Sequence, residues 1–237
     1  MALTPQNNDQ FAREVDEELR REEALALWKR WGKLIVAVIV AGLLALAGWL
    51  YWQSHREGVA GEQGIKFSQA MDDLGAKQTA KATPVLAELA TSGTEGYASL
   101  AKFTQADIAL QREDLKGAAK LFADVANDSG VAQPLRDLAL VRQTNAEYDS
   151  LQPQVVIDRL RPLAVKGNAF FGSAGEMTAV AHLRMNRKDL AGRLFGQIAR
   201  DDTVPASIRQ RAVQMAGVLG VDAIDEKRVQ TQSGQPS

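Results

Sequence analysis

The sequence predicts an all-α fold in which a single N-terminal transmembrane helix is followed by a solenoid of stacked helix pairs. Two observations lead to this prediction. Leu34–Trp52 is apolar throughout, and the region after it shows helices of similar length with a repeating apolar pattern. The composition agrees, because alanine and leucine are abundant, proline is sparse and β-branched residues are not clustered.

The segment Leu34–Trp52 reads LIVAVIVAGLLALAGWLYW and contains no charge, proline or carboxamide. As a helix it is roughly 28 Å long, close to the thickness of the hydrocarbon core of a bilayer. A helix from a soluble core is amphipathic, whereas this one is apolar on every side. A signal-peptide core is the alternative, but such cores are shorter and end in a small-residue cleavage site. We therefore expect an uncleaved transmembrane helix.

The charges beside this segment predict its orientation. Five lysine or arginine residues lie in the fifteen residues before it and two in the fifteen after it. Because the side richer in lysine and arginine stays in the cytoplasm, we expect a cytoplasmic N-terminus and an external C-terminal region. Trp28 and Trp31 on one side, and Trp49, Tyr51 and Trp52 on the other, are placed as interfacial aromatic residues.

These observations divide the chain into five parts. We expect a cytoplasmic arm at 1–33, the transmembrane helix at 34–52, a polar connector with three glycines at 53–64, a repeat domain at 65–220 and a disordered tail at 221–237. The arm is rich in glutamate and arginine, and it is either a solvated helix or a docking segment. The repeat region is long enough to bury a core of its own.

Within the membrane segment, Ala37, Ala41 and Ala45 form a ladder at helical spacing. Small residues at this spacing let another helix approach closely inside a bilayer. We expect this ladder to be a packing face. Alanine is common throughout the chain, so the ladder is also compatible with a helix that has no partner.

A weak repeat runs through the C-terminal region. Its predicted core anchors follow one another at intervals of 36, 38 and 35 residues, and each comes four residues after a small or β-branched residue. The anchors are Leu86, Phe122, Leu160 and Phe195. No single helix pair can bury such an apolar face alone, so the units must stack. The region around Leu160 is the most diverged copy.

This pattern resembles tetratricopeptide repeats. That family places a small residue, a phenylalanine and a further apolar residue at the spacing of Ala118, Phe122 and Val125. The tryptophan and tyrosine expected in the first helix are absent, and Lys102 and Ala109 occupy these places in one unit. The array is therefore a degenerate one.

The arm EVDEELRREEALALWKRWGK, the apolar helix and the degenerate repeats together resemble the YfgM-type family, ancillary subunits of the SecYEG translocon. This resemblance implies a bacterial inner-membrane protein with a periplasmic repeat domain. It also implies contact with the translocon, with periplasmic chaperones and with client polypeptides, and it implies no catalysis. The alternative is an envelope assembly factor, or a membrane-anchored enzyme, unrelated to the translocon.

The sequence offers little for catalysis. It has no cysteine, which excludes disulfides and thiolate chemistry, and its net charge of −1 gives no sign of a nucleic-acid surface. We expect no cofactor, because nucleotide-binding and zinc-protease motifs are absent. Gly172–Gly175 is interpreted as a helix start with Ser173 as its cap, and His182 as a packed histidine without a second metal ligand. The sequence leaves the oligomeric state open.

Overall fold

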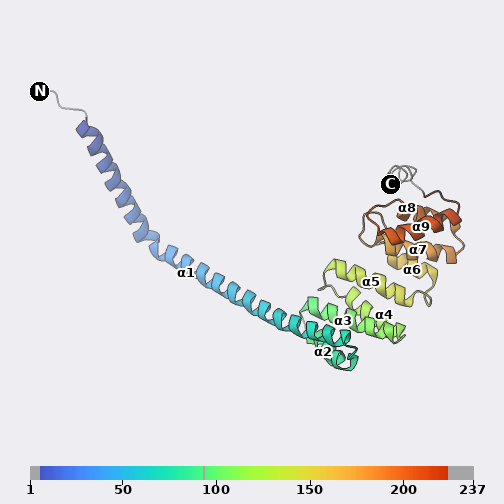
Figure 1. Ribbon diagram of the computed structural model, residues 1–237. Helices are drawn as coiled ribbons and strands as arrows, with labels where there is room; N and C mark the ends of the chain where they lie inside the picture. Colours follow the sequence, from blue (N-terminus) through green and yellow to red (C-terminus); the bar gives the residue numbers. More distant parts are fainter. Residues whose placement is uncertain (1–5, 93, 224–237) are drawn as a thin grey trace, which may run out of the picture. The chain divides into compact units, whose positions relative to one another are not determined.

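The computed structural model describes residues 6–92 and 94–223, and all regular structure within these residues is helical. Figure 1 shows the helices in chain order. The chain divides into two compact units, residues 1–61 and residues 62–237. The predicted all-α fold with helix pairs after an apolar N-terminal helix is confirmed.

Helix α1 (Gln6–Gly75) is longer than the sequence predicts, because it continues through the expected connector at 53–64. Each glycine in a helix costs about 1 kcal/mol relative to alanine. Propagation from an existing helix avoids the larger cost of nucleation, so glycines do not stop it here. The connector's end is also packed: Gln63 is buried, and its Oε1 accepts hydrogen bonds from the N–H and the hydroxyl of Thr94, both at 2.9 Å.

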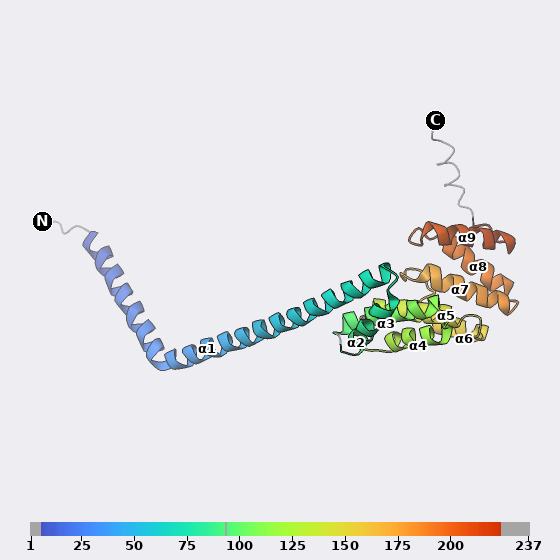
Figure 2. The same cartoon turned by 60° about the horizontal axis from the view of Figure 1, so that its bottom comes forward.

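The described part of the second unit contains four successive helix pairs and one further helix, and Figure 2 shows their succession. The order is residues 62–75 of α1 with α2 (Thr79–Ser92), α3 (Glu95–Gln111) with α4 (Leu115–Ala126), α5 (Gln133–Glu147) with α6 (Pro153–Leu160), and α7 (Phe171–Arg184) with α8 (Lys188–Ala199). Helix α9 (Ala206–Val218) follows the last pair and packs against α8.

The anchors lie in a layer of buried side chains that recurs in every pair. Leu86, Phe122, Leu160 and Phe195 are all fully buried. Sixteen residues before each anchor, the first helix of the pair carries a small residue that is also fully buried: Ala70, Ala106, Thr144 and Ala179. The hydroxyl of Thr144 donates to the carbonyl of Leu140 at 2.7 Å, so this polar member of the row is hydrogen-bonded. The small residue leaves room for the anchor of the second helix.

Three of the four turns inside the pairs have the same backbone conformation. Lys77, Glu113 and Asn186 have φ values of 60°, 61° and 57°, in the left-handed region. In each turn the next residue donates its N–H five residues back, as Gln78 does to Asp73, Asp114 to Ala109 and Arg187 to His182. This is the Schellman arrangement, which satisfies carbonyls at a helix C-terminus. The third pair lacks this turn, in agreement with its diverged sequence.

Two local predictions differ from the structure. Ser173 is not a helix cap, because α7 begins at Phe171, whose ring is buried in the core. The loop before α7 is instead closed by Asn168, whose Oδ1 accepts from the N–H of Phe170 at 2.8 Å. The predicted tail also starts too early: Val221 packs over Gly192 and Gly196 of α8, and Ala223 is buried. The rest of the predicted tail, 224–237, lies outside the described residues.

Candidate functional site

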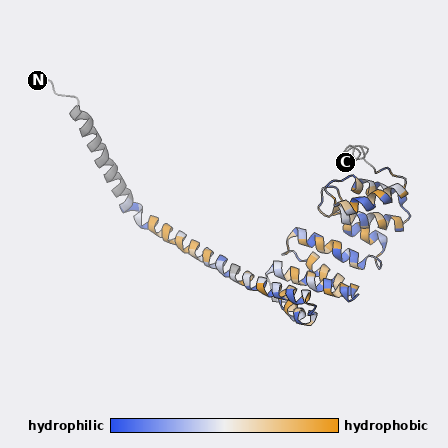
Figure 3. Ribbon diagram, in the orientation of Figure 1, coloured by the Kyte–Doolittle hydropathy of each residue, from blue (hydrophilic) through white to orange (hydrophobic). Residues whose placement is uncertain are grey.

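The apolar part of α1 is the first candidate site. Its best 18-residue window has a mean hydropathy of 2.5, and none of that window is buried. Figure 3 shows the apolar residues following one another along this helix. Among the described residues it is the one helix that is long and apolar enough to cross a membrane. Ala37, Ala41 and Ala45 are exposed on it, so the predicted packing face is open.

The second candidate site lies between α4 and α5. A cavity of about 640 Å³ opens there and includes Leu110 from the end of α3. Its α4 wall carries Leu115, Lys116, Ala119, Lys120 and Ala123, and its α5 wall carries Gln143, Asn145, Ala146 and Glu147, followed by Asp149 and Ser150. We refer to it as the α4–α5 cavity. Its volume falls in the range of about 300–1,000 Å³ that is typical of ligand sites.

A smaller cavity of about 380 Å³ opens on the other side of α5, toward α7, and we refer to it as the α5–α7 cavity. It is lined by Asn145, Tyr148, Asp149, Glu176, Met177 and Val180. Asn145 and Asp149 line both cavities. The C-terminal half of α5 is therefore open on two sides.

The cavities result from an irregular third pair. Helix α6 has eight residues, fewer than any other described helix, and α5 packs far more extensively against α4 than against α6. The C-terminal half of α5 is held by polar contacts instead. Glu147 accepts from Arg159 of α6 at 2.5 Å, and the Tyr148 hydroxyl donates to the carbonyl of Met177 at 2.9 Å. Burial raises the pKa of Tyr148, so this hydroxyl keeps its proton at neutral pH.

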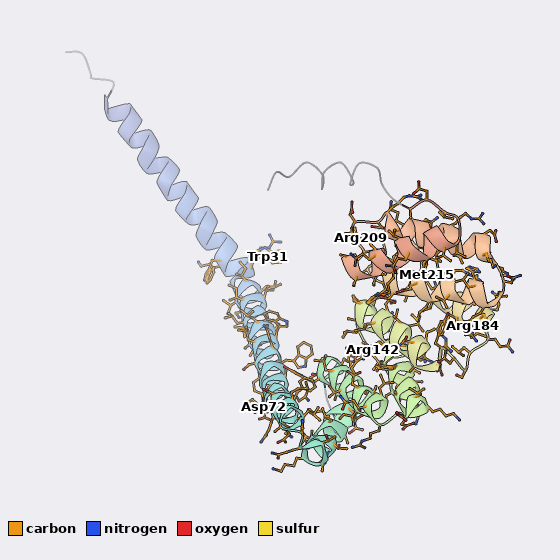
Figure 4. All side chains as sticks on the ribbon, turned by 45° about the vertical axis from the view of Figure 1, so that its right-hand side comes forward. Trp31, Asp72, Arg142, Arg184, Arg209 and Met215 are labelled. Atoms are coloured by element: carbon orange, nitrogen blue, oxygen red, sulfur yellow. The ribbon has the colours of Figure 1, made fainter. Side chains whose placement is uncertain are left out.

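Arginines also join successive units, and Figure 4 labels two of them, Arg142 and Arg184. Arg142 of α5 pairs with Asp107 of α3 and lies 4.9 Å from the ring centroid of the anchor Phe122. Arg184 of α7 donates to the carbonyls at the end of α5, those of Tyr148 and Leu151, at 3.0 and 3.1 Å.

The last of these contacts joins α9 to α7. Arg211 binds Glu176 through two hydrogen bonds of 2.7 and 2.6 Å. Each of these three arginines follows its partner by 33 to 36 residues, close to the length of the repeat. A planar guanidinium suits such two-point contacts, which fix the register of one unit on the next.

No group of three histidine, aspartate or glutamate side chains within the described residues could hold a metal ion. His182 is partly buried, and its Nδ1 has no hydrogen-bond partner among the described residues. Burial lowers its pKa. Asp201 closes a loop by accepting from the N–H and the hydroxyl of Thr203 at 3.0 and 2.7 Å, which lowers the pKa of this carboxyl.

Sequence reasoning missed the residues that line the two cavities. Lys116, Lys120 and Asn145 are exposed helix residues and Asp149 is an exposed turn residue, and no sequence motif marks any of them. The one available signal was the diverged third copy of the repeat, which coincides with the short α6.

The family described as tetratricopeptide repeat-like domain matches residues 26–215. The chain belongs to this family. The match includes the apolar part of α1 as well as the four helix pairs, so the apolar helix and the repeats belong to one family unit. The degenerate repeats predicted from the anchor spacing are therefore tetratricopeptide-like.

The tetratricopeptide-like chain is also similar to a curated protein of Haemophilus influenzae described as an ancillary SecYEG translocon subunit. The two are 21% identical over 187 residues, which is 79% of this chain and 90% of that protein. The predicted resemblance to such subunits is confirmed. No solved structure matches the chain.

Proposed function

We propose that this protein is a non-enzymatic membrane scaffold that acts as an ancillary subunit of the SecYEG translocon. The observation that carries the proposal is the extent of the similarity to the Haemophilus influenzae subunit, which covers nine-tenths of that protein. The family match over residues 26–215 takes in the apolar helix and the repeats together. Stacked helix pairs offer extended surfaces that suit polypeptides, which supports a scaffold.

In this proposal the protein crosses the inner membrane once, with residues 1–33 in the cytoplasm and the repeat domain in the periplasm. The lysine and arginine distribution around Leu34–Trp52 supports this orientation. The repeat domain then receives polypeptides that emerge from the translocon and hands them to periplasmic chaperones. Held beside the exit, it meets these chains at high effective concentration, so weak binding suffices.

The ladder of Ala37, Ala41 and Ala45 is the proposed contact with the translocon. Lipid tails are as apolar as leucine, so helix association in a bilayer depends on close packing, which small residues permit. All three alanines are exposed on α1.

The test replaces all three alanines with leucine and measures how much SecYEG co-purifies in mild detergent. Leucine preserves hydrophobicity, so we expect unchanged membrane content and a clear loss of co-purified SecYEG. The matched control exchanges Val36, Val40 and Leu44 for other large apolar residues, chosen from leucine, isoleucine and valine. The three alanines of the ladder then stay in place. If the variant with all three alanines replaced by leucine recovers as much SecYEG as the wild type, the contact is made by the arm or by the repeats.

The same purification tests the function as a whole. If the wild-type protein brings down envelope assembly proteins and no SecYEG, the scaffold belongs to another membrane complex. We expect the wild-type protein to bring down SecYEG together with periplasmic chaperones.

A further inference from the structure

The end of α5 and the turn after it form a ridge between two cavities. The α4–α5 cavity and the α5–α7 cavity both include Asn145 and Asp149, and both of these side chains are exposed. A single extended or helical segment that crosses this ridge would contact both cavities. The surface spans two of the helix pairs and reaches a third.

The floor of the α4–α5 cavity is apolar and made of small residues. Ala119 and Ala123 lie one helical turn apart on α4, and Ala146 faces them from α5. Leu115 stands at one end and is 52% exposed, which is high for a leucine beside a cavity. Small side chains let another backbone approach closely, and Leu115 would be covered by an apolar partner.

The charges change sign across the ridge. Lys116 and Lys120 lie one turn apart on α4, both exposed, and neither forms an ion pair with any described residue. Asp149 also lacks an ion-pair partner in the described part of the chain, and with Asn145 it lines both cavities. Glu147 and Glu176 are neutralised by Arg159 and Arg211. The cavity-lining charges that have no ion-pair partner among the described residues are therefore positive on α4, at Lys116 and Lys120, and negative at Asp149 in the turn after α5.

We propose that the two cavities bind one segment of a client polypeptide that is apolar in its middle, acidic at the end over α4 and basic at the end over Asp149. This proposal rests on the proposed function, because it names the chemistry of the client. The apolar middle would supply most of the affinity by covering Leu115 and the alanine floor. The charges would orient the segment, since exposed charge pairs add specificity more than affinity.

The test uses the full-length protein in detergent and two fluorescein-labelled synthetic peptides with the same leucine- and methionine-rich centre. The mixed peptide has glutamates at one end and arginines at the other, and the basic peptide has arginines at both ends. We expect wild-type protein to bind the mixed peptide more tightly in fluorescence anisotropy. Lys116→Glu with Lys120→Glu should weaken that binding about five- to tenfold and reverse the preference in favour of the basic peptide.

Two variants make the result specific. Lys81→Glu with Lys188→Glu changes the net charge equally at exposed residues of α2 and α8, and it should leave both affinities unchanged. Asn145→Trp places a large ring at a position that lines both cavities, so it should block both of them and abolish binding of both peptides. Circular dichroism melting checks that every variant folds as the wild type does.

The proposal is overturned if wild-type protein binds neither peptide, or if reversing Lys116 and Lys120 leaves the preference unchanged. It is also overturned if Asn145→Trp splits a dimer in analytical ultracentrifugation, because the cavities would then hold a second copy of the chain. Recovery of SecYEG by the same proteins is measured separately. Failed peptide binding with normal SecYEG recovery removes this inference alone, whereas absent SecYEG recovery removes the proposed function.

Discussion

The anchor residues dominate the energetics at the scale of single side chains. Phe122 and Phe195 are fully buried, and each lies in a cluster with small residues from the neighbouring helix. The Phe122 ring also contacts Phe103 at 5.7 Å between centroids and carries Arg142 over its face. Removal of such a ring loses its burial and leaves a cavity that close packing cannot fill.

We expect Phe122→Ala or Phe195→Ala to lower the free energy of unfolding by about 3–5 kcal/mol. Lys102→Ala and Gln111→Ala should change it by no more than about 0.5 kcal/mol, because Lys102 is only half-buried and Gln111 is exposed. Urea unfolding followed by circular dichroism measures both. Similar losses in the two classes of variant would mean that the repeat register is wrong.

His182 gives the repeat domain a specific pH dependence. Burial lowers its pKa from the ordinary value of 6.5, Arg187 lowers it further and Asp189 partly opposes the shift. The unfolded chain therefore takes up a proton at a higher pH than the folded chain. The contribution of His182 to stability is fully present above pH 6.5 and is lost as the pH falls from 6.5 toward its lower folded pKa.

We expect the free energy of unfolding of the wild type to drop between about pH 7 and about pH 5.5, and to drop less in His182→Gln. Urea unfolding at the two pH values measures the difference. Carboxylates such as Asp201 titrate at lower pH and contribute equally in both proteins. An identical pH dependence in the variant would exclude His182 as its source.

At the scale of an element, the shared turn inside the pairs carries measurable strain. Glu113 adopts a φ of 61°, where a side chain other than glycine costs about 1–2 kcal/mol. Asn186 in the equivalent turn tolerates this region better. The turn persists because its hydrogen bonds close the C-terminus of α3.

Glu113→Gly should raise the free energy of unfolding by about 0.5–1 kcal/mol, since relief of the strain exceeds the extra chain entropy of glycine. Lys120→Gly, in the interior of α4, is the control and should lower it by about 1 kcal/mol. Thermal melting of both variants is the measurement. A loss of stability in Glu113→Gly would show that the glutamate side chain makes a compensating contact.

At the scale of the whole molecule, the proposed orientation places the arm and the repeats on opposite sides of the membrane. We expect protease added to cytoplasm-out inner-membrane vesicles to remove only the arm before Lys33. The repeats should be digested only after the vesicles are opened with detergent. Mass spectrometry of the protected fragment reports its first residue. Digestion of the repeats in sealed vesicles would reverse the proposed topology.

The sequence by itself determined the apolar helix at Leu34–Trp52 and the helix pairs around Leu86, Phe122, Leu160 and Phe195. Both depend on local composition and on spacing along the chain, so they are visible without a structure. Only the tertiary structure decided that α1 continues to Gly75, that Phe171 rather than Ser173 sets the start of α7, and that cavities flank α5. These features depend on which distant side chains fill the space beside a helix. A short α6 leaves the end of α5 uncovered. The sequence of α5 does not predict the length of the helix that packs beside it.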